Sequence, residues 1–163
     1  GIEAIMNLLR ASEDAETDRL NFFMAQVFFW LITGIDGHAK NFSIALLPQS
    51  QFRMTPLYDV LSAHTIIGPA GLPYAKAKLA MAVRGKNNHY NLREIEYRHW
   101  VEMAGKLGLG DVIENAIIYM LDRIDVIIEM VVAQLPEGFP ADTASAIFAG
   151  VREQRERMLL QKK

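Results

Sequence analysis

The sequence predicts a mainly helical domain that carries one or two small β-hairpins. Apolar residues recur at three- and four-residue spacing over several long stretches, which is typical of amphipathic helices. Short apolar stretches flanked by turn residues indicate the hairpins. With 163 residues and a hydrophobic fraction of 51%, the chain can bury the core of one domain. We therefore expect a single mainly α, α+β domain over residues 1–163.

In the N-terminal half, two helices precede a hairpin. The first helix is expected over 2–10, and the second over 18–33 with Asp14 or Thr17 as its N-cap and Gly34 at its end. Strands are expected over 42–47 and 52–55, with a turn at 48–50. The second helix carries large apolar residues on several faces and should be buried nearly all round, as a central core helix. Its bulkiest members are Phe22, Phe23, Phe29 and Trp30.

The middle of the chain is less regular. Glycines and prolines predict irregular structure over 60–74, and the periodicity of 78–83 does not distinguish a strand from a helical turn. Residues 84–91 are polar and turn-like. Asn91 and Glu94 have the spacing of a capping box, so a helix is expected from there to Leu107, where Gly108 and Gly110 break it.

Two more helices are expected in the C-terminal part. Asp111 should cap a helix over 111–134 with one apolar stripe, and Pro136 should stop it. Asp142 should cap the last helix, whose strongly charged end at 152–163 is expected to fray. The predicted apolar stripe consists of Ile113, Ile117, Met120, Ile124, Ile127, Val131 and Leu135.

Composition narrows the classes of function. The net charge of −2 and pI of about 6.1 give no bulk reason for nucleic-acid affinity. The absence of cysteine excludes disulfides and thiolate metal sites, and scattered histidines do not suggest a zinc site. The longest apolar run, residues 22–32, is too short to cross a bilayer, and the first residues do not form a secretory leader. We expect a cytoplasmic protein that does not bind membranes.

Polar residues beside the most apolar run carry the chemistry. Asp36 and Asn41, separated by four residues, have the Asp-to-Asn spacing of a kinase catalytic loop, and Asp59 follows as the only nearby downstream acid. Magnesium prefers oxygen ligands of the kind that Asn41 and Asp59 offer. Spacing alone also fits a turn aspartate at position 36 and a helix N-cap at position 59. Acids and amides beside buried sequence are costly unless they bind something, which favours a site.

The segments DGHAKNFSI, RMTPLYDVLSA, KLAMAV and YRHW, in this order, resemble the C-terminal half of the HipA family of bacterial toxin kinases. The resemblance covers essentially the whole chain. It implies a kinase C-lobe-like fold, related to phosphoinositide kinases, and ATP-dependent serine/threonine kinase activity. It also implies that Asp36 is the catalytic base, and that Asn41 and Asp59 bind magnesium at the ATP site.

The same resemblance implies partners. These are a HipB-type helix-turn-helix antitoxin, DNA reached only through the antitoxin complex, and a protein substrate, which is glutamyl-tRNA synthetase in the best-known members. Within the loop, His38 is either a general base or a residue that orients Asp36 or the Asp59 segment, and we favour orientation. A purely structural histidine fits the sequence at least as well as a chemical one. Lys40 either neutralises the transferred phosphoryl group or is a solvated lysine.

The upstream part of a kinase is not visible in the sequence. No glycine-rich phosphate loop and no strand-borne VAIK-type lysine precedes Asp36, and the chain begins with Gly1. We therefore expect a fragment that lacks its N-terminal lobe and is inactive by itself. The alternative is a non-catalytic helical module that docks an antitoxin or another partner. Magnesium-dependent nucleotide binding by the intact protein distinguishes the two.

Overall fold

The computed structural model describes residues 1–68 and 70–162, including their side chains except that of Asp111. Within these residues the fold is mainly helical with two small antiparallel hairpins, which confirms the predicted fold class. The helices are α1 (Ile2–Leu8), α2 (Ala15–Leu31), α3 (Tyr97–Lys106), α4 (Gly110–Asp122), α5 (Ile124–Val132) and α6 (Ala141–Gln161). The strands are β1 (Ile44–Leu46), β2 (Phe52–Met54), β3 (Lys78–Arg84) and β4 (Asn88–Asn91). Short 3-10 turns are η1 (Leu9–Ala11), η2 (Ala39–Asn41), η3 (Pro48–Ser50) and η4 (Tyr74–Lys76).

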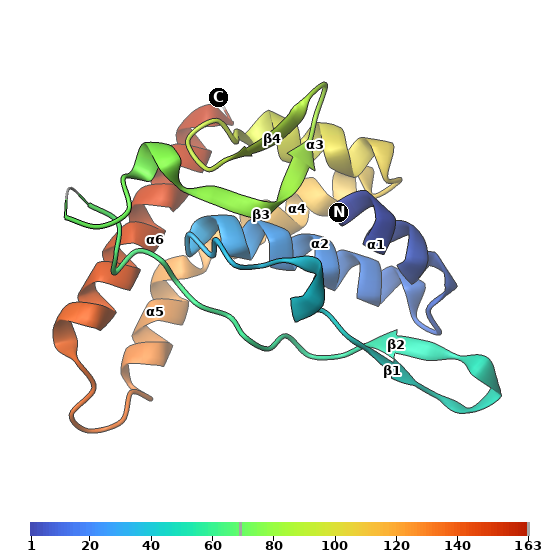
Figure 1. Ribbon diagram of the computed structural model, residues 1–163, viewed down its shortest axis with the longest axis horizontal. Coiled ribbons are helices and arrows are strands. Elements are labelled where there is room, and N and C mark those ends of the chain that lie inside the picture. Colours follow the sequence, from blue (N-terminus) through green and yellow to red (C-terminus); the bar gives the residue numbers. More distant parts are fainter. Residues whose placement is uncertain (69, 163) are drawn as a thin grey trace.

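Helix α2 is the centre of the molecule (Figure 1). It packs against α1, α4, α6 and β2, and its aromatic residues Phe22, Phe23, Phe29 and Trp30 are fully or almost fully buried. The prediction of a central core helix is thereby confirmed, although Phe28 remains 37% exposed. The helix starts three residues earlier than expected, since the Asp14 carboxylate accepts a hydrogen bond from the Thr17 backbone N–H at 3.2 Å.

The hairpin β1–β2 is the one expected, with Ile44 opposite Met54 and Leu46 opposite Phe52. A buried carboxylate, Asp18 in the first turn of α2, attaches this hairpin to the helix. It accepts hydrogen bonds from the Met54 backbone N–H at 2.7 Å and from the Ser12 hydroxyl. A buried carboxylate is stable only when hydrogen-bond donors compensate its desolvation. Because Met54 of β2 supplies one of these donors, Asp18 fixes the position of β2 on the helix.

The second hairpin corrects the expectation for residues 84–91. Residues 78–84 are a strand, and Asn88–Asn91 is its antiparallel partner rather than a turn-like segment. The capping-box prediction was also wrong. The Asn91 side chain instead accepts from the Arg93 N–H at 2.9 Å, and α3 begins later with Glu96 as its N-cap. The third helical residue, His99, completes that box by accepting from the Glu96 N–H at 3.1 Å.

His99 can accept this bond only when that ring nitrogen is unprotonated. Burial lowers the pKa of His99, and the imidazole of His89, stacked on it with ring centroids 3.8 Å apart, lowers it further. The stack joins β4 to the first turn of α3, so the hairpin and the helix form one unit.

The helix expected over 111–134 is two helices that meet at Arg123. Its buried residues are spaced by four, four, three and four positions: Ile113, Ile117, Leu121, Ile124 and Ile128. Ile127 and Val131, assigned to the stripe, are 45% and 41% exposed, because the break at Arg123 turns a different face of α5 toward the core. The N-cap position of α4 is Leu109, and the side chain of Asp111 lies outside the described part.

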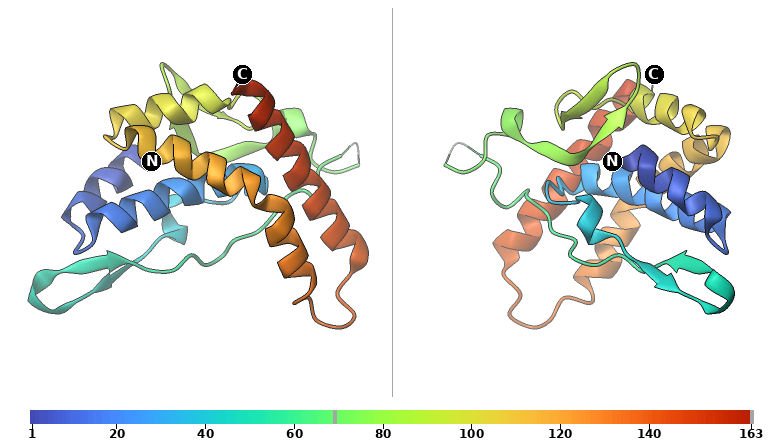
Figure 2. Two further views of the ribbon diagram at one scale, coloured as in Figure 1. Left: turned by 180° about the vertical axis from the view of Figure 1, so that it is seen from behind. Right: turned by 45° about the vertical axis from the view of Figure 1, so that its right-hand side comes forward.

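The last helix does not fray at residue 152. It begins at Ala141, with Pro140 in the N-cap position and Asp142 in the first turn, and continues to Gln161. Gln154 and Met158 are buried, and Arg157 donates to the carbonyl oxygens of Leu92 and Ile95. The two views in Figure 2 show α5 and α6 side by side, and Arg152 and Arg155 of α6 pair with Asp125 of α5. In the described residues, no helix is long and apolar enough to cross a membrane.

Candidate functional site

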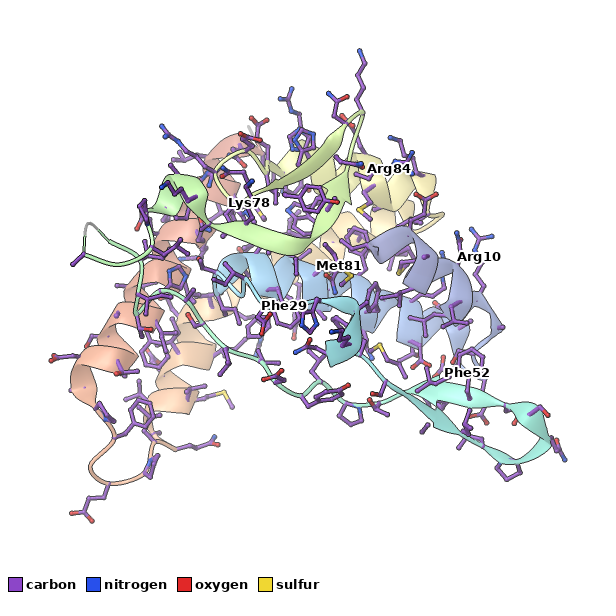
Figure 3. The ribbon with its side chains drawn as sticks, in the orientation of Figure 1. Arg10, Phe29, Phe52, Lys78, Met81 and Arg84 are labelled. Carbon is purple, nitrogen blue, oxygen red and sulfur yellow. The ribbon has the colours of Figure 1, made fainter. Side chains whose placement is uncertain are left out.

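The glycines of the predicted catalytic loop lie directly against the ring of Phe29, a residue of α2 that Figure 3 labels. A Cβ atom added to Gly34 would meet the Phe29 ring at 2.4 Å, and one added to Gly37 would meet it at 2.9 Å. The Gly34 N–H donates to the Phe29 carbonyl at 2.6 Å, and Phe42 packs edge-on against Phe29 at 6.1 Å. The two glycines are therefore required by contact with an aromatic ring, which lets the loop return across the helix.

Asp36 lies at the exposed tip of this loop. Its side chain is 69% exposed, and one carboxylate oxygen is 3.5 Å from Nε2 of His38. The His38 backbone N–H donates to the Asp36 carbonyl at 2.8 Å, so the two residues form one tight turn. An accessible carboxylate beside an imidazole can accept a proton from a bound hydroxyl group while the imidazole orients it.

Asn41 and Asp59, from different segments, meet next to the loop. The Asn41 Nδ2 donates to the Asp59 carboxylate at 2.6 Å, and Asn41 is 3% exposed while Asp59 is exposed. Asp59 has a backbone φ of 54°, a left-handed conformation that is uncommon for residues other than glycine. Strain of this kind is often found where a side chain must point into a functional site.

The amide oxygen of Asn41 suits a cation. It is buried and has no hydrogen-bond partner among the described residues. Rotating the amide by 180° would bring this oxygen beside the Asp59 carboxylate, an arrangement that is repulsive unless a cation lies between them. The described residues contain no group of three or more His, Cys, Asp or Glu side chains that could hold a metal. Asn41 and Asp59 alone therefore fit magnesium that is otherwise held by phosphate oxygens and water.

Residues that the sequence analysis did not single out hold the Asp59 segment in place. Ser62 donates to the Ile32 carbonyl at 2.7 Å, the Ala63 N–H donates to the Thr33 carbonyl, and the His64 imidazole contacts the Leu31 carbonyl at 2.9 Å. Carbonyls at the end of a helix lack partners within it, so residues 62–64 cap α2. No one-dimensional spacing links these residues to the end of α2, so the sequence gives no signal for this cap.

His64 is covered from the other side by α6. A Cβ atom added to Gly150 would lie 2.1 Å from its Nδ1 atom. Burial lowers the pKa of His64. A neutral imidazole can donate from Nε2 to the Leu31 carbonyl and accept at Nδ1 from the Thr33 hydroxyl at 3.5 Å, so the cap does not need a charge.

Tyr58 links the segment of Asp59 to the segment of Lys40 and Asn41. The Tyr58 hydroxyl donates to the Lys40 carbonyl at 2.9 Å and lies 2.7 Å from the Ser43 hydroxyl. Tyr58 precedes Asp59, so this bridge orients the acid. The Lys40 side chain is exposed, and no ion pair among the described residues includes it. The structure thus pairs Asp36 with His38 and Asn41 with Asp59, and the Lys40 carbonyl contacts Tyr58, the neighbour of Asp59.

Comparisons with known proteins agree with the sequence resemblance. Residues 1–138 match the family model described as the HipA-like C-terminal domain. A curated protein of Sinorhizobium fredii (strain NBRC 101917 / NGR234), named "Putative kinase Y4mE", is 34% identical over 103 residues, which are 63% of this chain and 22% of that protein. The chain thus spans about a fifth of the length of that relative.

A solved structure has the same fold. In the complex of the Shewanella oneidensis MR-1 toxin–antitoxin system HipA, HipB and its operator DNA, one chain superposes with a TM-score of 0.79. The sequence identity is 22%, and the match covers 98% of this chain and 36% of that one. The structural likeness extends beyond residue 138 into α6.

Proposed function

Because the chain belongs to the HipA-like C-terminal domain family, we propose that it is the C-terminal lobe of a cytoplasmic serine/threonine protein kinase, the toxin of a toxin–antitoxin module. The observation that carries the proposal is the 2.6 Å contact between Asn41 and Asp59 beside the loop of Asp36. A base and two oxygen ligands in one place are what phosphoryl transfer from a nucleotide requires.

Each residue has a role in this proposal. The Asp36 carboxylate accepts the proton of a serine or threonine hydroxyl, whose oxygen forms the new bond to the γ-phosphorus while the bond to the β,γ-bridging oxygen breaks and ADP leaves. His38 orients Asp36, and Lys40 faces the transferred phosphoryl group. Asn41 and Asp59 hold magnesium, which when bound neutralises the phosphate charge. This arrangement catalyses by positioning and charge neutralisation.

The rest of the kinase belongs to the proposal as well. A glycine-rich loop and a phosphate-binding lysine would come from an N-terminal lobe, consistent with a chain that covers about a third of its structural neighbour. A HipB-type antitoxin is the proposed partner, since the neighbour is a HipA–HipB–DNA complex. DNA would be reached only through the antitoxin, and glutamyl-tRNA synthetase is one candidate substrate, taken from the family resemblance. The contact between Asn41 and Asp59 favours the kinase over the alternative, a non-catalytic binding module.

Calorimetric titration of the intact protein with Mg-ATP tests the proposal. We expect the wild type to bind only with magnesium present, and Asp59→Asn to bind at least about tenfold more weakly, a loss of about 1.4 kcal/mol. Asp36→Asn should bind normally but transfer no phosphoryl group to serine. Asp122→Asn, an exposed acid on α4, is the matched control and should behave as wild type. Equal binding by wild type and Asp59→Asn would contradict the proposal.

A further inference from the structure

Thr33, which lies between α2 and the catalytic loop, has a backbone conformation that β-branched residues rarely adopt. Its φ is 53°, in the left-handed region, and its side chain is fully buried. For a residue with a branched Cβ atom this conformation is a steric outlier, and it persists only where the surrounding structure holds it. The turn at Thr33 therefore needs contacts from outside the loop.

The conformation of Thr33 decides where the loop goes. The next residue, Gly34, donates its backbone N–H to the Phe29 carbonyl and packs on the Phe29 ring. If Thr33 relaxed to the right-handed region, with φ of about −60°, every following atom would be redirected and the loop would leave that ring. Asp36 follows Thr33 closely in the chain, so the proposed base would move with the loop.

The segment after the proposed metal ligand supplies the contacts that hold this turn. We call residues 62–64 the clamp. The Ala63 N–H donates to the Thr33 carbonyl at 3.2 Å. His64 binds the turn in two places, since its Nε2 donates to the Leu31 carbonyl at 2.9 Å and its Nδ1 accepts from the Thr33 hydroxyl at 3.5 Å. The strained residue is thus held through both its carbonyl and its side chain.

The imidazole of His64 is itself held in place. Gly150 of α6 lies against it, and a Cβ atom added there would be 2.1 Å from Nδ1. The His64 backbone N–H also donates to the Ser62 hydroxyl at 3.2 Å. A ring that is packed against α6 on one side and bonded to the turn on the other can resist the relaxation of Thr33.

We infer that His64 is a positioning residue of the kinase, which holds Thr33 in its strained conformation and thereby keeps Asp36 in place. The inference rests on the proposed kinase function. His64 lies on the same segment as Asp59, so the clamp connects the proposed base to the segment of a proposed metal ligand. Loss of the clamp should displace the base without removing any group that contacts the nucleotide or the acceptor.

Hydrogen–deuterium exchange of the intact protein tests this inference through variants of His64. In His64→Ala, the hydrogen-bonded amides within residues 34–41 should exchange at least about tenfold faster, while those of residues 20–30 in α2 stay protected. In His64→Gln the side-chain amide can still donate to the Leu31 carbonyl, so exchange should stay near wild type. His99→Ala is the matched control, because it removes a buried histidine that caps α3 outside the site.

Kinetics separate positioning from folding. We expect His64→Ala to lower kcat for phosphorylation of serine-containing peptides at least about tenfold, because a displaced base slows transfer. The Kd for Mg-ATP should stay within about twofold of wild type, or about 0.4 kcal/mol, since Ser62 still attaches the Asp59 segment to α2. His64→Gln should retain most of the wild-type kcat, and His99→Ala should leave both constants unchanged.

A second substitution tests the strain itself. Glycine adopts a φ of 53° without steric cost, so a chain with Thr33→Gly should not need the clamp. Added to His64→Ala, this substitution should return the exchange of residues 34–41 and kcat most of the way to wild type. A folded double variant that recovers neither would show that His64 does not act on Thr33, and the inference would be overturned.

The outcomes separate the two proposals. If His64→Ala leaves the exchange of residues 34–41 unchanged, or speeds it without lowering kcat, the positioning role is wrong and the kinase proposal stands. Equal effects of His64→Ala and His99→Ala on the loop would indicate only a loss of overall stability, which also contradicts the inference. Absence of Mg-ATP binding by wild type would refute the kinase proposal itself.

Discussion

At the scale of single residues, the site depends on close contacts that only small or flexible groups permit. Gly37 is buried against the Phe29 ring, and Gly34 is packed still closer to it. The loop therefore packs directly against the Phe29 ring of α2, and a larger residue at either glycine would collide with that ring. Residue types, more than loop length, define where the proposed base lies.

Replacing Gly37 with alanine should displace the loop. The new methyl group would lie 2.9 to 3.1 Å from three ring atoms of Phe29, so we expect a loss of about 1 to 3 kcal/mol in the free energy of unfolding. Urea denaturation measures it. Gly105→Ala is the control, since its Cβ would meet no atom within 4 Å on the exposed side of α3 and should stabilise by about 0.5 to 1 kcal/mol. Equal effects of the two substitutions would show that Phe29 does not limit the loop.

At the scale of elements, the charged end of α6 is where local sequence misleads. Its charge density predicts fraying, yet Arg157 donates to the carbonyls of Leu92, Arg93 and Ile95 and to the Tyr74 hydroxyl, and its guanidinium lies over the Trp30 ring. These carbonyls belong to the chain between β4 and α3. The end of α6 therefore fixes the connection between β4 and α3 to the core helix α2.

Arg157→Gln should destabilise the fold well beyond an ordinary surface change. Several carbonyl groups would lose their donor, so we expect a loss of about 2 to 4 kcal/mol and a lower Tm in thermal denaturation. Arg152→Gln, which removes an exposed ion pair with Asp125 on the same helix, should cost less than about 1 kcal/mol. If the two variants melted at the same temperature, the anchoring role of Arg157 would be refuted.

At the scale of the whole molecule, one domain holds the proposed base and both proposed metal ligands. Tertiary contacts at the end of α2 bring Asp59 beside Asn41, while the hairpin β1–β2 that separates them in sequence projects away (Figures 1 and 2). The two proposed metal ligands are thus in contact within these residues. The glycine-rich loop and the lysine that would bind the phosphates are assigned, in the proposal, to an N-terminal lobe.

The chain of residues 1–163 should not transfer phosphate by itself. Without a covering loop and a phosphate-binding lysine, we expect turnover at least about a thousandfold below that of the intact protein, since each positioned cation contributes several kcal/mol. Incorporation of labelled phosphate into serine-containing peptides measures it. Turnover by the isolated chain that disappears in Asp36→Ala would contradict this expectation.

The sequence by itself determined the fold class, most of the helices and strands, and the family. Hydrophobic spacing and turn residues act over a few positions, so α2, the first hairpin and the loop of Asp36 follow from them. The HipA-like resemblance is confirmed by the family match, and the five site residues stay predictions with specified roles. Their proximity in the structure is consistent with those roles.

Only the tertiary structure decided how distant segments meet. The contact between Asn41 and Asp59 depends on Ser62 and His64 finding unpaired carbonyls at the end of α2, which no local pattern encodes. Likewise, Glu96 and not Asn91 is the N-cap of the capping box, because Asn91 belongs to β4. Arg157 holds the end of α6 because backbone carbonyls converge on it. Buried hydrogen-bonding groups need partners, and where neighbouring residues in the sequence supply none, residues from distant segments do. Which segments these are depends on the tertiary structure.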